Sequence, residues 1–526
     1  MASYSIIIKN GVIFDGTGNP SSPADIGIIG DKIKEIGNLK KDEAPIIIDA
    51  SNKYVSPGFI DLTTHSDTHW TLFSQPSQES FIRQGITTIL GGHGGSSLAP
   101  LVKAENIESI QKWVDVSKIN INWQSMAEFF SELEQHQIAI NFGTLVGYGT
   151  IRRGVIGEEV RPARNHEIAQ MKYLAEKSIK EGAFGISTNL GAAHQKSATN
   201  EEITEILNVA RTTKTFAAHH LENEGKNILP AIARLILLTR NSGVHSHISH
   251  FKAIGKIAWQ YFPKGLEMIE QARKEKIQMT CDFFPYTRTG SNLYLLLPVW
   301  AVESGKKRIL EIIAGKERKN LLESLRDLTL HYEKIIVAST LHDVNAVGKS
   351  ILKLSQSAGI TPEEVILNLL EVNDLQVAIF NEAISENNIE LLAGKDYSIV
   401  ASDGVGYAAG YRSKTDLPHP RSFGAFPRVF RLVKEKGLLS WENAIYKMTG
   451  FPAKVLGITD RGILTNGAYA DILIFDPEAI ADTADYVNPY QSPAGINYVL
   501  INGDIVLEED SLTGLNPGRI LRRFQK

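Results

Sequence analysis

Histidine and aspartate side chains recur at the ends of predicted strands in this 526-residue chain. Five of the eight strands predicted below end in one of them, namely His65, His93, His220, His250 and Asp403. The chain has only 14 histidines, so four at strand ends exceed what chance placement suggests. Three neutral imidazoles that converge on one point make a zinc site with an open fourth position. Water bound there ionises near neutral pH, and a carboxylate such as Asp403 can accept its proton. This pattern indicates metal-assisted hydrolysis of an amide or a related bond.

Each histidine also has a structural interpretation. His219 and His220 are neighbours in a strand and point to opposite faces, so only one of them can face the interior. In the run VHSHISH, His245 and His247 lie on the face opposite His250. A hydrogen-bonded structural histidine is the alternative for each of these residues.

Two further candidates stand beside turn-forming residues. The run GGHGGSS surrounds His93 with glycines, which permit close backbone approach, although a plain tight turn would also contain them. Asp403 is followed by glycine and fits either a turn or a carboxylate held at a strand end. A nucleophilic mechanism has less support, because no GxSxG motif is present and Cys281 lies inside an apolar strand as a buried thiol.

The elements that would position these residues alternate between strands and helices. The predicted strands are 58–65, 87–93, 138–146, 183–188, 215–220, 244–250, 277–284 and 397–403. Most of the intervening stretches carry a helical pattern, such as NHEIAQMKYLAEKSIKEG. Eight alternating strands and helices indicate an α/β protein with a (β/α)₈ barrel over 58–460, which places catalytic groups at the carboxyl ends of its strands. The seventh connection is too long for one crossover helix and predicts a helical insertion at about 285–345 that could cover the barrel mouth.

The two ends of the chain have a different sequence pattern, typical of short antiparallel strands. Short β-branched runs with Gly, Asp and Asn turns fill 1–57 and recur in 461–526. Neither end has enough strands to be stable alone, so we expect both to pair into one small β domain.

The composition narrows the class of protein. A net charge of −4, with 43% hydrophobic and 22% charged residues, gives no reason to expect a nucleic-acid or membrane partner. A single cysteine excludes an intrachain disulfide framework. No apolar run is long enough for a membrane span, and the first residues lack the pattern of a signal peptide. We expect a soluble, cytoplasmic protein with a small-molecule substrate.

A series of motifs runs in order along nearly the whole chain. They are PGFIDLTTHSD, GITTILGGHGGSSLAP, GTLVGYGTIR, EGAFGISTNL, ISHFKAIGK, FFPYTRTGS, ASDG, HPRSFGAFPRV and LTNGAYADILIFDP. With these motifs the chain resembles the amidohydrolase superfamily, and within it the D-aminoacylase (N-acyl-D-amino-acid deacylase) family. The resemblance implies a (β/α)₈ barrel, a small β-sandwich formed by both chain termini, and zinc-dependent hydrolysis of a linear amide.

The resemblance also implies roles for single residues. His220 and His250 match zinc ligands, and His93 stands where the family usually has a zinc-binding Cys. Asp403 matches the catalytic aspartate. Arg421 matches an arginine expected to grip the substrate carboxylate, a task that suits the guanidinium fork.

Three more positions match residues near the substrate. Lys252 matches a lysine beside the second zinc histidine, where it would tune the electrostatics of the site. Tyr286 and Ser291 align with residues that line the pocket.

The chain departs from the family at two metal positions. The first strand normally ends in His-x-His, but Thr63 replaces the first of these histidines, and its hydroxyl is a poor zinc ligand. A Cys thiolate readily bridges two metals, whereas the imidazole of His93 does not. We therefore predict one zinc ion per chain, held by His93, His220 and His250, with His65 as a weak or indirect partner.

Other departures concern the substrate. Tyr148 replaces a histidine common in the family and is expected near the substrate, while Glu222 stands where the family often has Arg. Phe284 replaces a tyrosine, and Ala192 replaces an aromatic residue. Several of these positions hold the substrate's acidic group in typical members, so the substrate need not be a standard N-acyl-D-amino acid.

Three hypotheses follow. The first is a zinc-dependent hydrolase of an N-acylated amino acid or a related linear amide. The second is a cyclic-amide hydrolase or a ring-closing relative, since one fold supports many reactions. The absence of a lysine at the end of the fourth predicted strand, GISTNL, argues against the dinuclear form typical of many ring hydrolases. The third is a non-catalytic relative that serves as a binding or scaffold protein.

Overall fold

Parallel strands form the centre of the molecule. The computed structural model describes residues 4–103, 107, 121–302, 306–328, 330–408, 410–413 and 415–524. Each of the eight predicted strands overlaps an observed one. These are β6 (Phe59–Asp61), β7 (Ile86–Gly91), β8 (Asn141–Thr144), β10 (Gly185–Asn189), β11 (Phe216–His220), β12 (His245–Ile248), β13 (Met279–Phe283) and β17 (Ser398–Val400). Nearly all their residues are buried, as expected for parallel strands covered on both faces.

These strands make two parallel sheets that meet at both edges. One sheet has the order β6-β7-β8, and the other has the order β17-β13-β12-β11-β10-β9, where β9 (Val146–Gly147) follows β8 after one residue. At the other edge, Thr64 and Gly404 form a parallel bridge, and the amide of Asp403 donates to the carbonyl of Thr63 at 3.0 Å. The residues that follow β6 and β17 are therefore neighbours.

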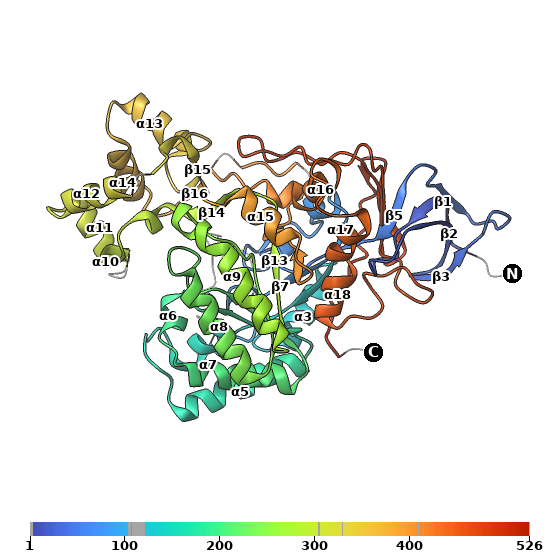
Figure 1. The fold of residues 1–526 in the computed structure, drawn as a ribbon, viewed down its shortest axis with the longest axis horizontal. Coiled ribbons are helices and arrows are strands. Elements are labelled where there is room, and N and C mark those ends of the chain that lie inside the picture. Colours follow the sequence, from blue (N-terminus) through green and yellow to red (C-terminus); the bar gives the residue numbers. More distant parts are fainter. Residues whose placement is uncertain are drawn as a thin grey trace.

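Helices connect successive strands and pack against the sheets (Figure 1). The longer ones are α3 (Met126–Gln135), α4 (Tyr148–Ile156), α5 (Asn165–Lys180), α7 (Asn200–Thr212), α8 (Ile228–Ser242), α9 (Lys256–Lys274) and α16 (Arg421–Lys434). The shorter ones are α1 (Thr71–Ser74), α2 (Glu79–Ile82), α6 (Ala193–Lys196), α15 (Glu386–Ala393), α17 (Trp441–Met448) and α18 (Gly450–Leu456). In α5 the buried side chains Met171, Ala175 and Ile179 recur at helical spacing, so one face of the helix covers the sheet.

Both chain termini contribute to a nine-stranded sheet at one end of the molecule (Figure 1). Its strands are β1 (Ile6–Ile13), β2 (Ser22–Ile29), β3 (Lys32–Gly37), β4 (Ile46–Asp49), β5 (Tyr54–Pro57), β18 (Ile472–Phe475), β19 (Ile496–Ile501), β20 (Asp504–Glu508) and β21 (Ser511–Leu512). The order is β21-β20-β19-β18-β5-β1-β2-β3, with β4 paired to β1. The antiparallel pair of β5 and β18 joins the N-terminal strands to the C-terminal ones.

A lobe at the opposite end is inserted between β13 and β17 (Figure 1). It contains the antiparallel strands β14 (Arg288–Asn292), β15 (Ile335–Thr340) and β16 (Val377–Glu382). Its helices are α10 (Val299–Val302), α11 (Lys306–Ala314), α12 (Arg318–Asp327), α13 (Ile351–Ala358) and α14 (Pro362–Val372). The sequence predicts only helices over about 285–345, part of which lies outside the described residues. The sheet is additional, because β14 and β16 pair across some 90 residues and periodicity does not report such pairing.

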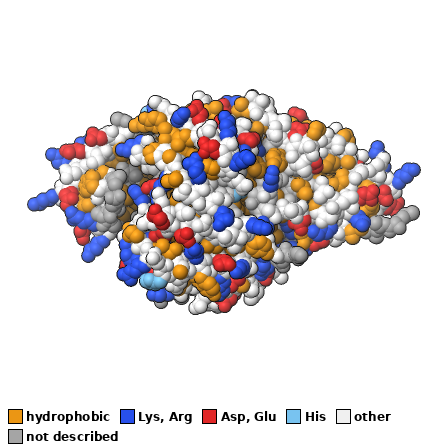
Figure 2. Space-filling view, turned by 60° about the horizontal axis from the view of Figure 1, so that its bottom comes forward, with side chains coloured by type: hydrophobic (Ala, Val, Ile, Leu, Met, Phe, Trp, Pro, Cys, Tyr) orange, Lys and Arg blue, Asp and Glu red, His pale blue; other side chains and the backbone are white. Residues whose placement is uncertain are grey.

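The surface in Figure 2 mixes both signs of charge, with hydrophobic side chains in scattered groups. Among the described residues, no helix is both long and apolar enough to cross a membrane.

Candidate active site

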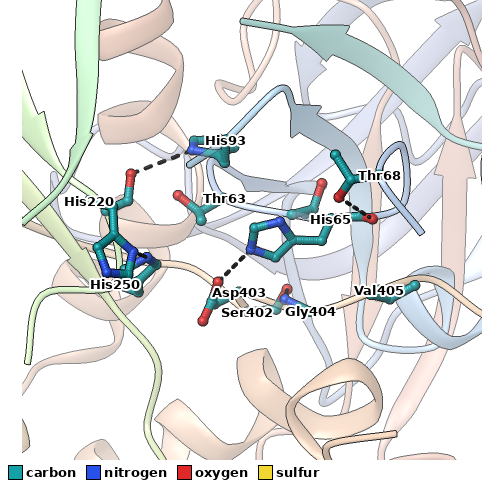
Figure 3. Close-up of polar contacts among 12 residues, drawn as sticks. Thr63, His65, Thr68, His93, His220, His250, Ser402, Asp403, Gly404 and Val405 are labelled. Atoms are coloured by element: carbon teal, nitrogen blue, oxygen red, sulfur yellow. Dashed lines mark hydrogen bonds and ion pairs between the residues drawn. The ribbon is translucent and has the colours of Figure 1, made fainter. Parts of the chain in front are cut away.

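The residues singled out in the sequence lie at the carboxyl ends of the parallel strands (Figure 3). His220 is the last residue of β11, and His250 lies two residues beyond β12. His65, His93 and Asp403 follow β6, β7 and β17. Parallel strands bring their carboxyl ends to one edge, so residues from distant parts of the sequence meet there.

His220 and His250 are in direct contact. The Nδ1 atom of His220 is 3.0 Å from Nε2 of His250, and the ring centroids are 4.5 Å apart. His250 has a left-handed backbone with φ of 41°, and Asp282 Oδ1 accepts a hydrogen bond from its amide at 2.6 Å. Two nitrogens on one tetrahedral zinc would be about 3.3 Å apart, given Zn–N distances of about 2.0–2.1 Å. The observed spacing is close to that value.

The loop that carries His93 requires glycine at the position before it. Gly92, with φ of 77°, precedes it, and a Cβ atom there would lie 2.2 Å from the carbonyl oxygen of Leu145. The Nδ1 atom of His93 is 3.4 Å from Oγ of Ser249, while its buried Nε2 has no hydrogen-bond partner. An unpaired buried ring nitrogen is costly unless it meets a ligand.

Two of the candidate ligands, His93 and His220, are neutral imidazoles. Burial lowers the pKa of His93 to about 3, and the neighbouring His65 adds to this effect. Burial likewise lowers the pKa of His220 to about 3. A neutral imidazole has a free lone pair, which is the form that binds zinc.

Asp403 is held between two partners. Its Oδ1 lies 2.8 Å from Nε2 of His65, and its Oδ2 lies 2.7 Å from Nη1 of Arg421. Burial alone would raise the pKa of Asp403, but Arg421, His250 and His65 together outweigh it, so the pKa lies well below its usual range. The guanidinium also lies over the ring of Phe284. Arg421, predicted to grip a substrate carboxylate, is thus paired with Asp403 in this structure.

Lys252 and Glu224 form an ion pair beside the two histidines. The Nζ atom of Lys252 is 2.7 Å from Oε1 of Glu224 and 2.8 Å from Nδ1 of His250. Burial alone would raise the pKa of Glu224, but Lys252 and His220 lower it well below its usual range. The predicted place of Lys252 beside His250 agrees with this contact, whereas the sequence analysis missed Glu224. Its only signal was its position four residues after His220.

A buried hydrogen-bond network surrounds the hydroxyl of Thr63. The hydroxyl of Thr63 donates to Asp282 Oδ2 at 2.6 Å, and Nε2 of His247 lies 2.7 Å from the same oxygen. Sequence reasoning missed Asp282, whose signal was a lone carboxylate within the apolar strand MTCDFF. Two histidines that neighbour the candidates in sequence make structural contacts. His219 contacts Thr188 and Ser246, and His245 contacts Thr280.

The three predicted pocket residues differ in their contacts. Tyr286 is buried, and its hydroxyl donates to the carbonyl of Pro420 at 3.4 Å. Ser291 is half-buried in β14, opposite Ile379 of β16. Tyr148 was expected near a substrate, but its buried hydroxyl donates to Glu202.

The donor chemistry of this edge fits zinc, although the geometry is not that of a closed metal site. In the described part of the chain, no group of three or more His, Cys, Asp or Glu side chains has the arrangement to hold a metal ion as it stands. His220 and His250 contact each other, while the contacts of His93 are with Ser249 and the ring of His65. The unpaired Nε2 of His93 and the spacing of the other two rings are the observations that favour a metal.

Known proteins resemble this chain over its whole length. The model of the amidohydrolase family matches residues 389–507. The D-aminoacylase of Alcaligenes xylosoxydans xylosoxydans is 29% identical over 99% of this chain and 98% of its own length. The N-acyl-D-glutamate deacylase of the same organism is 29% identical over 98% of this chain and 96% of its own length.

Solved structures agree with these relatives. The N-acyl-D-glutamate deacylase of Bordetella bronchiseptica, crystallised with zinc and a phosphonate mimic of the tetrahedral intermediate, superimposes with a TM-score of 0.83 at 26% identity and covers 99% of this chain and all of that one. A D-aminoacylase with a binuclear metal centre, studied for activation by one metal and attenuation by the second, has a TM-score of 0.81 at 29% identity with the same coverage. Over its full length, the chain is therefore similar in sequence and in fold to the D-aminoacylases and to N-acyl-D-glutamate deacylase.

Proposed function

We propose that this protein is a zinc-dependent hydrolase that cleaves the linear amide of an N-acyl-D-amino acid or a related N-acylated substrate. The observation that carries the proposal is the placement of the His220–His250 contact and of Asp403 at one edge of the parallel strands. The deacylase relatives support the same reaction class. The substrate would be a small molecule with an amide and a carboxylate.

The proposed metal site holds one zinc ion per chain through His93, His220 and His250. Two contacts argue against a second ion. The hydroxyl of Thr63 is committed to Asp282, and the Nε2 atom of His65 is committed to Asp403. His65 would then act indirectly, by holding the carboxylate of Asp403.

The reaction assigns a task to each polar residue. When bound, zinc polarises the amide carbonyl and makes water more acidic. Asp403 accepts a proton from the attacking water at a carboxylate oxygen and returns it to the departing nitrogen. Arg421 pairs with the substrate carboxylate and must then exchange its contact with Asp403 for the substrate. Lys252, Tyr286 and Ser291 are proposed to contact the substrate as well.

The proposed architecture is a closed (β/α)₈ barrel over 58–460 and a small β-sandwich from 1–57 and 461–526. The contact of the two parallel sheets at both edges supports the barrel. The pairing of β5 with β18 supports a common terminal domain. The lobe between β13 and β17 takes the place of the predicted insertion at 285–345.

Two measurements test the proposal. Protein purified without added zinc should contain about one equivalent of zinc, and His220→Ala should lose it. The same protein should release free amine from a panel of N-acyl-D-amino acids, with the N-acyl-L series as the stereochemical control.

The alternatives predict other results. Turnover of hydantoins or imides, together with silence across the panel, would replace the proposal with a cyclic-amide hydrolase. An L-hydantoinase from Arthrobacter aurescens shares the fold at a TM-score of 0.58 and 16% identity. Absence of both zinc and amine release would favour a binding or scaffold protein.

A further inference from the structure

Glu224 is a buried carboxylate that faces both proposed ligand histidines on the strand ends. Its Oε1 lies 3.3 Å from Nδ1 of His250, and its Oε2 lies 4.0 Å from Nε2 of His220. These nitrogens are on the sides of the rings opposite the contact between His220 Nδ1 and His250 Nε2. The carboxylate of Glu224 therefore faces both rings on the sides away from their mutual contact.

The backbone around Glu224 is fixed. The carbonyl of Glu224 accepts a hydrogen bond from the amide of Ile254 at 2.7 Å, which ties this loop to the one that follows β12. Asn223 caps the next turn, with Oδ1 accepting from the amides of Gly225 at 3.0 Å and Asn227 at 3.1 Å. The carboxylate is held against the histidines by the fold and by Lys252.

A ligand histidine commonly donates its second ring N–H to a carboxylate, which fixes the orientation and tautomer of the ring and strengthens metal binding. We propose that Glu224 is the positioning residue for the zinc site and acts through His220 and His250. This inference rests on the proposed function. Glu224 touches neither the substrate nor the reacting atoms in this role.

Lys252 completes the arrangement. Its ammonium lies 2.7 Å from Glu224 Oε1 and 2.8 Å from His250 Nδ1, so cation and carboxylate meet at the same ring nitrogen. A lysine ammonium can only donate, whereas an ionised carboxylate can only accept. If zinc were held by the other ring nitrogen of His250, Nδ1 would carry the ring proton, and Glu224 could accept a hydrogen bond from it.

Glu222 provides a matched control in the same loop. Its carboxylate pairs with Arg234 at 2.7 Å, and Arg234 also donates to Asn200. The two variants Glu224→Gln and Glu222→Gln thus make the same chemical change two residues apart. Only the first removes a carboxylate that faces the histidines.

The experiment measures zinc affinity by competition with a chromophoric chelator. Glu224→Gln should bind zinc 10- to 100-fold more weakly than the unmodified protein, and Glu222→Gln should bind it unchanged. At saturating zinc, KM of Glu224→Gln should stay near that of the unmodified protein, because Glu224 does not contact the substrate. Equal zinc affinity in Glu224→Gln and the unmodified protein would overturn the inference.

A second variant and a zinc measurement on the unmodified protein complete the experiment. If Glu224→Gln does not fold, as judged by circular dichroism, Glu224→Asp keeps the charge opposite Lys252 but shortens the reach to the rings. It should also bind zinc more weakly, and unchanged affinity would again overturn the inference. If the unmodified protein itself binds no zinc, the proposed function fails rather than this inference, so the two failures are distinguishable.

Discussion

At the scale of single residues, the site is defined by which partner each charged side chain already has. Asp403 bridges His65 and Arg421, so the proposed proton acceptor is oriented before any substrate arrives. Thr63 donates to Asp282, so its hydroxyl is committed to a buried hydrogen bond. These contacts orient the carboxylate of Asp403, the proposed proton acceptor, and give Thr63 a structural task.

Asp403→Asn tests the proton transfer. The amide cannot accept a proton from water, so kcat should fall by about 10²–10⁴-fold. Zinc content should stay near one equivalent, since Asp403 is not among the three proposed ligands. Steady-state kinetics and metal analysis of the same preparation measure both quantities, and an unchanged kcat would remove Asp403 from the mechanism.

Asp61 is a second residue with a specific pH dependence. Its Oδ1 accepts from the amides of Thr63 and Ser402, and burial raises its pKa to about 8. Between about pH 4 and 8 the unfolded chain ionises this group while the folded protein keeps it protonated. Its contribution to stability is therefore complete below about pH 4 and is lost as pH rises toward 8.

Asp61→Asn keeps the acceptor and removes the ionisation. Its stability relative to the unmodified protein should rise by about 1.4 kcal/mol per pH unit between pH 5 and pH 7.5. Denaturant unfolding at several pH values measures this difference. A difference that does not vary with pH would show that Asp61 is ionised in the folded protein.

At the scale of elements, short loops after the parallel strands set the positions of the proposed ligands His93 and His250. The loop after β7 carries His93 between Gly92 and Gly94, both with positive φ. The space around the two glycines differs. A Cβ at Gly92 would collide with the backbone of Leu145, whereas at Gly94 no heavy atom lies within 4 Å. Glycine is required at position 92 because the loop packs closely against the residue that follows β8. At position 94, glycine is required only for its positive φ.

A pair of alanine variants separates these effects. Gly94→Ala should cost about 1 kcal/mol of stability and leave zinc binding intact, because only the positive φ is strained. Gly92→Ala should displace the loop and weaken zinc binding at least tenfold. Chelator competition and thermal unfolding of both variants check the ranking, and equal zinc affinities would contradict it.

At the scale of the whole molecule, histidines packed between strands make stability depend on pH. His219 and His245 lie between neighbouring strands, and burial lowers their pKa values to about 3 and about 4. Below pH 6.5 the unfolded chain takes up protons that the folded protein does not. Stability is therefore lost as pH falls from about 6.5 toward 4.

Calorimetry between pH 7 and pH 4.5 should show a falling Tm. His245→Gln removes one of these groups and should flatten the slope by up to about 1.4 kcal/mol per pH unit. His136→Gln is the control, since His136 is exposed on the surface, where it contacts Glu132 and the ring of Phe73. A slope in His245→Gln equal to that of the unmodified protein would show that His245 is protonated in the folded state.

Much of the parallel core was predictable because its signals are local. Each of the eight strands gave a short apolar run, and alternation within β11 separated His219 from His220, whereas His250 lies beyond β12, where alternation no longer applies. The three-stranded sheet of the lobe was not predictable in this way. Its strands pair over long separations with helices between them, and a local pattern contains no information on such pairing.

The sequence by itself determined which side chains stand at strand ends, because strand periodicity and turn residues act over a few positions. Motifs that span the chain also carry its resemblance to the D-aminoacylases. Tertiary structure alone decided that Glu224 faces His220 and His250, that Asp282 takes the hydroxyl of Thr63, and that Tyr148 turns to Glu202. Such contacts depend on the packing of several strands and loops at once, so no single segment specifies them.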